Sequence, residues 1–332
     1  MPSPAPSSSG LVDQFNRRIE YLRVSVTDRC DLRCVYCMPE GFTDFEEPAD
    51  WLTFDELERL LGAFARLGVS RIRFTGGEPL LRRNLPELAG RITRLPGIRD
   101  LSLSSNATQL EKHASALKQA GVSRLNISLD SLRPERIKAI NGRDAHHRIM
   151  AGIEAARVAG FSPIKINMVA MAGVNDDEID DMVDYCISNG FVLRLIETMP
   201  MGETGRNASY LDLQPVREGL QARFDLIEGN IGHGGPARYL QSRDGRFSVG
   251  FITPISQHFC DTCNRVRLSV DGTLYLCLGQ EHSFNFRPLL RAQASDAELE
   301  QAIQQAISLK PQRHEFVEKP QQVIRFMSMT GG

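Results

Sequence analysis

The sequence predicts an α/β protein that forms an open partial barrel of six strand–helix units, followed by an α+β extension. Three observations support this prediction. Strand-like and helix-like segments alternate from about residue 22 to residue 198, the strand-like segments are apolar on one face and polar on the other, and turns with short strands follow residue 200. Such alternation is typical of a parallel sheet with right-handed crossovers. Because a closed eight-stranded barrel fills its interior with branched apolar side chains, the polar faces favour an open barrel that holds a polar ligand.

Length and composition are ordinary for a globular protein and argue against several classes of function. The chain has 332 residues, of which 42% are hydrophobic and 24% charged, with a formal net charge of −2. A net charge near zero argues against a general nucleic-acid coat. No apolar run approaches the roughly 18 residues of a membrane span. Seven cysteines, six of them in two tight triplets, are unlike a disulfide framework and fit a reduced, cytoplasmic compartment.

The first residues indicate a tail, and the character of the chain changes at about residue 200. Residues 1–10 are rich in proline and serine and lack the apolar segment of a secretory signal. We expect a disordered tail over residues 1–14, the partial barrel over residues 15–200, and a C-terminal region over residues 201–332 that covers the barrel opening.

The strand candidates share a two-faced pattern. In the first of them, Arg23 and Ser25 flank the apolar Val24. The candidates are residues 22–27, 71–75, 100–104, 124–129, 164–169 and 192–197. Four strands each place one cation on the polar face: Arg23, Arg73, Lys165 and Arg194. Because unpaired buried charge is costly, converging cations predict an anionic ligand, and arginine forks suit triphosphate oxygens. The alternative is a one-sided antiparallel sheet that faces water, against which the helical crossovers argue.

Helical patterns fill the intervals between these strands. They lie near residues 53–67, 85–94, 109–120, 147–160 and 176–189. Thr53 with Glu56 three residues later forms a predicted capping box. Glycines that can adopt a left-handed conformation follow four of the helices: Gly68, Gly121, Gly160 and Gly190. No G-x-G-x-x-G follows the first strand, so a dinucleotide-binding fold has no support.

A cysteine triplet follows the first strand in the pattern C-x3-C-x2-C. Its members are Cys30, Cys34 and Cys37. Thiolates bind soft metals and iron–sulfur clusters, and three thiolates on one loop leave one iron of a [4Fe–4S] cubane without a protein ligand. A small molecule can bind and react at such an iron. Zinc sites with a structural role usually have four protein ligands, so a zinc site or a set of buried thiols is the alternative.

Two further motifs add to the first triplet. Thr75-Gly76-Gly77-Glu78-Pro79 ends the second strand, and its paired glycines let the backbone approach a ligand closely. A second triplet, C-x2-C-x13-C, comprises Cys260, Cys263 and Cys277. The remaining Cys186 lies in a predicted helix and is interpreted as a buried thiol, and His233 in a glycine-rich loop is a weak candidate ligand. We therefore interpret the second triplet as the ligand set of a second cluster, in which one iron has no protein ligand.

These motifs together resemble the radical S-adenosylmethionine (SAM) superfamily, and within it the GTP 3′,8-cyclases of molybdenum cofactor biosynthesis. The second triplet with Arg265 and Arg267 narrows the resemblance, which covers about residues 15–332 and includes the terminal Gly331-Gly332. It implies an open partial TIM barrel, (βα)6, of the radical SAM type, with a C-terminal α+β extension that carries a second [4Fe–4S] cluster. In the family, the terminal diglycine reaches toward the active site.

The resemblance also assigns roles to residues. The implied cluster ligands are Cys30, Cys34, Cys37, Cys260, Cys263 and Cys277. The implied SAM contacts are Tyr36, Gly77, Ser128 and Met199. The implied GTP contacts are Arg23, Arg73, Ser104, Lys165, Arg194, Arg265 and Arg267, and the last two are also expected to be catalytic. One departure is Ser104-Ser105-Asn106-Ala107, where the family commonly has Thr-Thr-Asn-Gly; hydroxyls persist at both positions.

The implied activity is that of a lyase that converts GTP to (8S)-3′,8-cyclo-7,8-dihydroguanosine 5′-triphosphate in the first step of molybdenum cofactor biosynthesis. In this family, a [4Fe–4S] cluster cleaves SAM to a 5′-deoxyadenosyl radical that removes the ribose 3′ hydrogen, and a second cluster binds the guanine of GTP. The implied partners are GTP, SAM, an external one-electron donor and the downstream cyclic pyranopterin monophosphate synthase. The resemblance implies a cytoplasmic protein that is a monomer or a homodimer. It implies no nucleic acid and no membrane as a partner.

Two other interpretations remain open from the sequence. One is another radical SAM enzyme with an auxiliary cluster, such as a peptide-modifying maturase, although such enzymes usually carry more C-terminal cysteines. The other is a zinc-stapled nucleotide-binding adaptor without catalytic activity. Iron and sulfide analysis separates a radical SAM enzyme with two clusters from a zinc-stapled adaptor, since two cubane clusters require about eight irons per chain.

Overall fold

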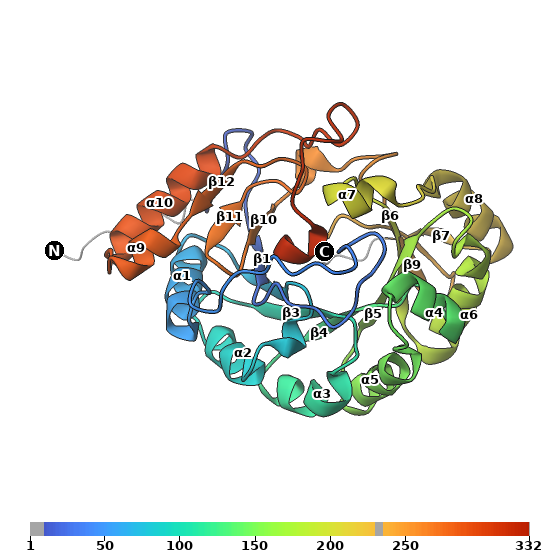
Figure 1. Ribbon diagram of the computed structural model, residues 1–332. Helices are drawn as coiled ribbons and strands as arrows, with labels where there is room; N and C mark the ends of the chain where they lie inside the picture. The colour runs from blue at the N-terminus through green and yellow to red at the C-terminus, as the bar shows by residue number, and fades with distance from the viewer. Residues whose placement is uncertain (1–9, 230–234, 332) are drawn as a thin grey trace.

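The computed structural model describes residues 10–229 and 235–331, and one sheet runs through the whole molecule (Figure 1). The first six strands are parallel and lie in chain order. They are β1 (Tyr21–Ser25), β2 (Arg71–Thr75), β3 (Asp100–Ser105), β4 (Arg124–Ser128), β5 (Ile164–Ala170) and β6 (Val192–Glu197). The predicted strands are confirmed to within two residues at each end, and the sheet is the open partial barrel that the sequence predicts.

The C-terminal half extends this sheet at both edges. The strand β10 (Arg265–Leu268) pairs in parallel with β1, and β9 (Ser248–Ile252) pairs in parallel with β6. The outer strands are antiparallel: β11 (Thr273–Tyr275), β12 (Ser283–Asn285), β8 (Arg238–Gln241) and β7 (Ile227–Gly229). The sheet therefore continues across the expected boundary at residue 200, and the C-terminal half flanks the barrel.

Helices cover the outer side of the curved sheet (Figure 1). They are α1 (Phe54–Arg66), α2 (Leu85–Thr93), α3 (Leu110–Gln119), α4 (Pro134–Asn141), α5 (His146–Val158) and α6 (Ile179–Asn189), with the 3₁₀ turns η1 (Pro79–Leu81) and η2 (Asp176–Glu178). The capping box of Thr53 and Glu56 is present. Gly68, Gly121, Gly160 and Gly190 all have positive φ angles. The apolar sides of these helices and the sheet form one large core.

The remaining helices lie in the C-terminal half. They are α7 (Gly202–Asn207), α8 (Leu213–Arg223), α9 (Arg287–Arg291), α10 (Asp296–Ser308) and α11 (Met327–Thr330), with the 3₁₀ turn η3 (Cys260–Thr262). Figure 1 shows α11 on the inner side of the curved sheet, where it contacts β1. Among the described helices, none combines the length and apolar character that crossing a membrane requires.

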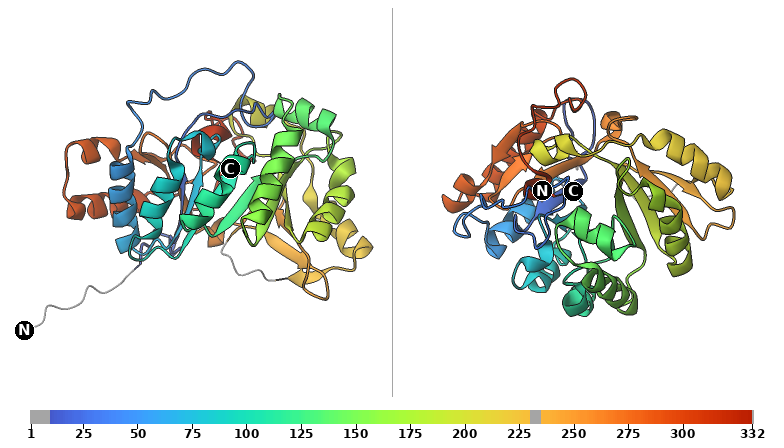
Figure 2. Two further views of the ribbon diagram at one scale, coloured as in Figure 1. Left: turned by 90° about the horizontal axis from the view of Figure 1, so that it is seen from below. Right: turned by 45° about the vertical axis from the view of Figure 1, so that its right-hand side comes forward.

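The N-terminal segment and the connection after β1 frame the barrel. Packing begins at Leu11, which is buried in the main core and whose N–H donates to Leu67 O at 2.8 Å, so residues 11–14 belong to the folded part and not to the expected tail. The connection from β1 to α1, blue in Figure 2, arches over the end of the barrel where the strands have their carboxyl termini. It carries the first cysteine triplet at the end of the sheet where parallel strands usually place functional groups.

Candidate active site

Both cysteine triplets line the same cavity, although more than 220 residues separate them in the chain. The cavity has a volume of about 240 Å³ and lies at the carboxyl ends of the parallel strands. Cys30, Cys34 and Cys37 line it from the β1–α1 connection, and Cys260, Cys263 and Cys277 line it from the C-terminal half. All six cysteines are free thiols. The cavity therefore joins the two ligand sets that the sequence predicts.

The loop of the first triplet is fastened to α4, a helix that the sequence analysis did not predict. Arg33 N donates to Asn141 O at 2.9 Å, and Val35 N donates to Ile140 O at 3.0 Å. The Cys34 thiol lies 3.5 Å from Asn141 Oδ1. Burial raises the pKa of all three thiols, that of Cys37 to about 12. Because a cationic metal centre would stabilise the thiolates, this buried set of reduced thiols fits an iron–sulfur ligand set.

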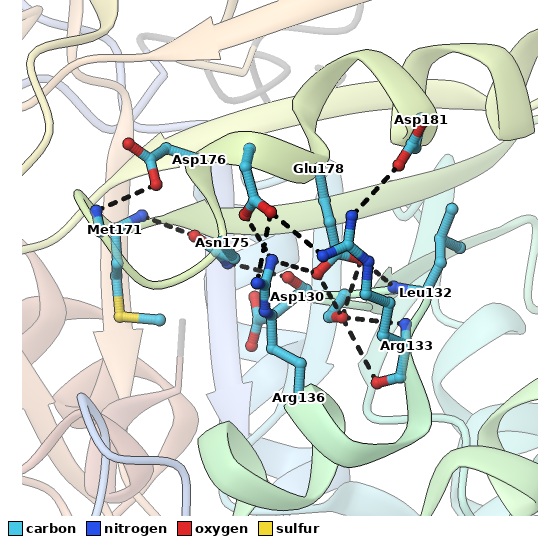
Figure 3. Close-up of polar contacts among 12 residues, drawn as sticks. Asp130, Leu132, Arg133, Arg136, Met171, Asn175, Asp176, Glu178 and Asp181 are labelled. Atoms are coloured by element: carbon cyan, nitrogen blue, oxygen red, sulfur yellow. Dashed lines mark hydrogen bonds and ion pairs between the residues drawn. The ribbon is translucent and has the colours of Figure 1, made fainter.

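Tyr36, within the triplet, is connected to the end of β4. Its hydroxyl donates to Asp130 Oδ2 at 2.7 Å, and Asp130 Oδ1 accepts from Val169 N at 2.9 Å. Burial raises the pKa of Asp130 to about 6, against the lowering effect of the hydrogen bond from Tyr36. The Asp130 carbonyl accepts from Asn175 Nδ2 at 2.8 Å (Figure 3). The triplet is thus positioned by residues from two strand–helix units, those that begin with β4 and β5.

Asn175 lies between Met171 and Asp130 in the polar network of Figure 3. It is fully buried, and it also donates to Val169 O at 2.9 Å and accepts from Met171 N at 2.8 Å. Nearby, the buried Glu178 accepts from Leu132 N at 3.0 Å and from Arg136 at 2.6 Å. These contacts hold the segments that follow β4 and β5.

Asn175→Ala should lower the free energy of unfolding of the metal-free protein by at least about 2 kcal/mol, because three buried backbone groups lose their partner. Urea unfolding measures this change. Asn189→Ala is the control: Asn189 is exposed and makes one contact, to Tyr185 O, so about 0.5 kcal/mol or less is expected. Equal losses in the two variants would contradict the anchoring role of Asn175.

The turn Thr75-Gly76-Gly77-Glu78-Pro79 packs against the chain just before Cys30. Gly77 N donates to Thr27 O at 3.0 Å, and Glu78 N donates to Arg29 O at 2.8 Å. A Cβ added at Gly77 would lie 2.3 Å from Arg29 O, so only glycine fits there. The carboxylate of the buried Glu78 accepts from Leu80 N, Ser105 Oγ and Asn106 N at 3.0, 2.9 and 2.7 Å. Burial raises the pKa of Glu78 to about 7, although these donors lower it.

Asn106 connects that turn to the first triplet. Its Nδ2 donates to Asp31 Oδ1 at 2.9 Å and lies 3.8 Å from Cys30 Sγ. Thr108 Oγ1 donates to Asp31 Oδ2 at 2.7 Å. Asn106 belongs to the segment Ser104-Ser105-Asn106-Ala107 that the sequence singles out, whereas Asp31 was not a predicted site residue.

The second triplet is surrounded by cations. Cys260 and Cys263 lie at η3, and Arg265 Nη2 is 3.9 Å from Cys263 Sγ. Burial raises the pKa of Cys263, but Arg265, Lys310 and Arg267 outweigh it and bring the pKa down to about 6. Within residues 10–229 and 235–331, no three His, Cys, Asp or Glu side chains converge as ligands of a single metal ion. A cubane distributes its protein ligands over separate irons and does not require that convergence.

The predicted ligand-binding residues divide into those that line the cavity and those that do not. Most line the cavity: Arg23, Tyr36, Gly77, Ser104, Ser128, Met199, Arg265 and Arg267. The buried Nε atoms of Arg23 and Arg267 and the buried Oγ of Ser104 have no hydrogen-bond partner. Polar atoms of this kind are costly unless a ligand satisfies them.

The other three predicted cations do not line this cavity. Arg73 Nε donates to Ser102 Oγ at 3.3 Å, Arg194 Nε donates to Asn167 Oδ1 at 2.8 Å, and Lys165 Nζ lies 3.5 Å from Tyr239 OH. All three are buried on the sheet, and Arg73 is the register partner of Arg23. Burial, with the nearby Arg194, lowers the pKa of Lys165 to about 7. Positive charge is therefore concentrated on the sheet next to the cavity, although these three side chains do not line it.

The C-terminal segment also reaches the site. Met327, His314, Phe316 and Lys310 line the cavity, and none of them was a predicted site residue. A Cβ added at Gly331 would lie 2.1 Å from Thr75 Oγ1, so the described end of the chain packs on the end of β2. Gly332 and His233 lie outside the described residues.

Comparisons with known proteins agree with this architecture. A sequence profile of the Radical SAM superfamily matches residues 24–186, and a profile of Molybdenum Cofactor Synthesis C matches residues 191–316. The GTP 3′,8-cyclase of Pseudomonas entomophila is 49% identical over 97% of this chain and 98% of its own length. The GTP 3′,8-cyclase of Hydrogenovibrio crunogenus is 46% identical over 97% of this chain and 99% of its own.

Solved structures support the fold. The crystal structure of Streptococcus suis SuiB matches with a TM-score of 0.62 at 17% identity, over 85% of this chain and 68% of SuiB. SuiB bound to S-adenosylmethionine matches with a TM-score of 0.56 at 15% identity, over 96% of this chain and 77% of SuiB. Membership of the Radical SAM superfamily implies a [4Fe–4S] cluster and SAM. Because this chain is 49% and 46% identical to these two relatives over 97% of its length, it belongs to the GTP 3′,8-cyclase family of the radical SAM superfamily.

Proposed function

We propose that this protein converts GTP to (8S)-3′,8-cyclo-7,8-dihydroguanosine 5′-triphosphate as a radical SAM lyase, in the first step of molybdenum cofactor biosynthesis. The observation that carries the proposal is one cavity lined by two separate cysteine triplets and by cationic atoms without partners. A zinc-stapled adaptor has no need of two incomplete ligand sets that face a shared cavity.

At one end of the cavity, Cys30, Cys34 and Cys37 would hold a [4Fe–4S] cluster, and Tyr36, Gly77, Ser128 and Met199 would bind SAM. The residues fit these groups, since three free thiols line the cavity together with Tyr36, Gly77, Ser128 and Met199. When bound, the cluster and SAM supply the radical that removes a hydrogen atom from the substrate ribose. The residues of the chain orient SAM, and the surrounding strands exclude water and other hydrogen donors.

At the other end, Cys260, Cys263 and Cys277 would hold a second [4Fe–4S] cluster next to the guanine of GTP. The pKa of about 6 of Cys263 favours a thiolate at neutral pH, which is the form that binds a metal. Arg265 and Arg267 flank this triplet, and we assign to them the binding of GTP and the stabilisation of charge that develops as the ring closes.

The triphosphate would bind the cationic side of the barrel. Arg23 and Ser104 have unpartnered atoms at the cavity, and Arg73, Lys165 and Arg194 are buried on neighbouring strands. A triphosphate would satisfy these groups and reduce the repulsion among the cations, with movement of the last three side chains toward the ligand.

The proposed reaction requires partners outside this chain. An external one-electron donor supplies electrons, and cyclic pyranopterin monophosphate synthase receives the product. We propose a cytoplasmic protein that acts as a monomer or homodimer, with neither nucleic acid nor a membrane among its partners.

The reconstituted, chemically reduced protein should form 5′-deoxyadenosine in amounts that depend on GTP, together with a cyclised dihydroguanosine triphosphate. Incubation with SAM and GTP, ATP, CTP or UTP in parallel, followed by liquid chromatography and mass spectrometry, measures both products. The expected result is cyclised product with GTP alone. SAM cleavage that is equal for all four nucleotides, without cyclised product, would refute the proposed substrate.

A further inference from the structure

Three buried cations from other parts of the chain lie around the second cysteine triplet. They are Arg17 from the N-terminal segment, Lys310 just after α10, and Arg325 just before α11, and their exposed fractions are 7%, 2% and 4%. Each donates to backbone carbonyls on or beside a triplet cysteine. Arg17 Nη1 lies 2.9 Å from Cys260 O, and Arg325 Nη2 lies 3.0 Å from Cys277 O. The proposed ligand set is thus fixed by positive charge from both ends of the chain.

Lys310 connects two parts of the triplet. Its Nζ donates to Leu276 O at 2.6 Å and to Arg265 O at 3.1 Å, and it lies 4.0 Å from Cys263 Sγ. Leu276 immediately precedes Cys277, and Arg265 follows Cys263 by two residues. A single ammonium group therefore joins the two segments that carry these cysteines, and it lies near one of the sulfurs.

Lys310 differs from its two neighbours in having no carboxylate partner. Arg17 forms an ion pair with Asp13 at 2.6 Å, and Arg325 forms one with Glu281 at 2.5 Å. Among the described residues, no carboxylate lies within ion-pair distance of Lys310. Burying an uncompensated ammonium is costly, so within the described part of the chain this charge is left to be balanced by the thiolates of the triplet and what they bind.

We propose that Lys310 is a positioning residue of the second cluster, which fixes the segments that carry Cys263 and Cys277 and raises the reduction potential of the cluster through its uncompensated charge. This inference rests on the second cluster of the proposed function. Hydrogen bonds and charge near cluster sulfurs are established determinants of cluster potential, because a nearby cation stabilises the more negative, reduced state.

The test compares Lys310→Met with Lys310→Arg in the reconstituted full-length protein. Redox titration followed by electron paramagnetic resonance gives the midpoint potentials of both clusters, and the signal absent from Cys277→Ala identifies the second. In Lys310→Met this potential should shift to a more negative value while that of the first cluster stays unchanged. Lys310→Arg should restore it toward wild type. Arg124→Met, which removes a largely buried cation paired with Asp100 on β3, should shift neither potential.

Iron analysis completes the test. Loss of the second cluster from Lys310→Met, with about eight irons retained in Lys310→Arg, would also support the proposal. Two unchanged potentials in a fully loaded Lys310→Met would overturn it, as would loss of the second cluster from both variants. If Lys310→Met does not fold, Lys310→Gln is titrated with the same criteria. A wild-type protein with only about four irons would refute the second cluster itself, independently of Lys310.

Discussion

Cys37→Ala should abolish the formation of both 5′-deoxyadenosine and cyclised product, and should lower the iron content from about eight to about four per chain. Cys37 lines the cavity with Cys30 and Cys34, and the described chain offers no other thiol near this loop. Two remaining thiolates cannot hold a cubane that already lacks one protein ligand. Iron and sulfide analysis and anaerobic assays with SAM and GTP measure the three effects.

Cys186→Ala is the matched control for this change. Cys186 is the seventh cysteine, and it is fully buried in α6, within the main core and away from the cavity. The variant should retain about eight irons and near wild-type product formation, with a loss of stability on the order of 1 kcal/mol. Wild-type rates of SAM cleavage in Cys37→Ala would contradict the ligand role of the first triplet.

Gly77→Ala should reduce SAM cleavage by about 100-fold or more, because the added methyl group forces apart two segments of the SAM site. The new Cβ would lie 2.3 Å from Arg29 O and 2.8 Å from Asp28 O, and these are backbone atoms that cannot rotate away. Gly77 does not have a positive φ angle, so the effect arises from lack of space and not from backbone strain. Calorimetric titration with SAM and assays of 5′-deoxyadenosine measure the loss.

Gly90→Ala makes the same chemical change where space is available. Gly90 lies inside α2, and its added Cβ would be 3.5 Å from the end of the Arg94 side chain. Since alanine favours helices, this variant should gain about 0.5–1 kcal/mol in stability and should keep its SAM affinity. Unchanged SAM affinity in Gly77→Ala would remove the reason for assigning this turn to SAM.

Most of the barrel could be predicted because its signals are local. Alternating polarity located β1 to β6, and cap residues such as Thr53 and Gly190 located the ends of helices. The helix α4 was missed because it has only eight residues and directly precedes α5, although Pro134 and Gly142 mark its ends. The pairing of β9 and β10 with the barrel could not be predicted, because a strand's distant partner leaves no trace in its own sequence.

The site was predictable to the extent that its residues fall in motifs. The cysteine spacing and the paired glycines identified the two ends of the cavity. Lys310 and His314 were missed because each is an isolated residue that only folding brings to the cysteines. The partners of Arg73, Lys165 and Arg194 were also beyond prediction, since alternation shows which face a side chain occupies but not which side chains it contacts.

The pairing of β10 with β1 and of β9 with β6 has a consequence for biosynthesis. While the ribosome has released only the first 200 residues, both margins of the nascent sheet expose unpaired backbone groups, which invite association with other chains. The barrel becomes complete only when the last third of the polypeptide emerges. The second cysteine triplet and the strands that flank the barrel therefore join the fold late in synthesis, after the six central strands.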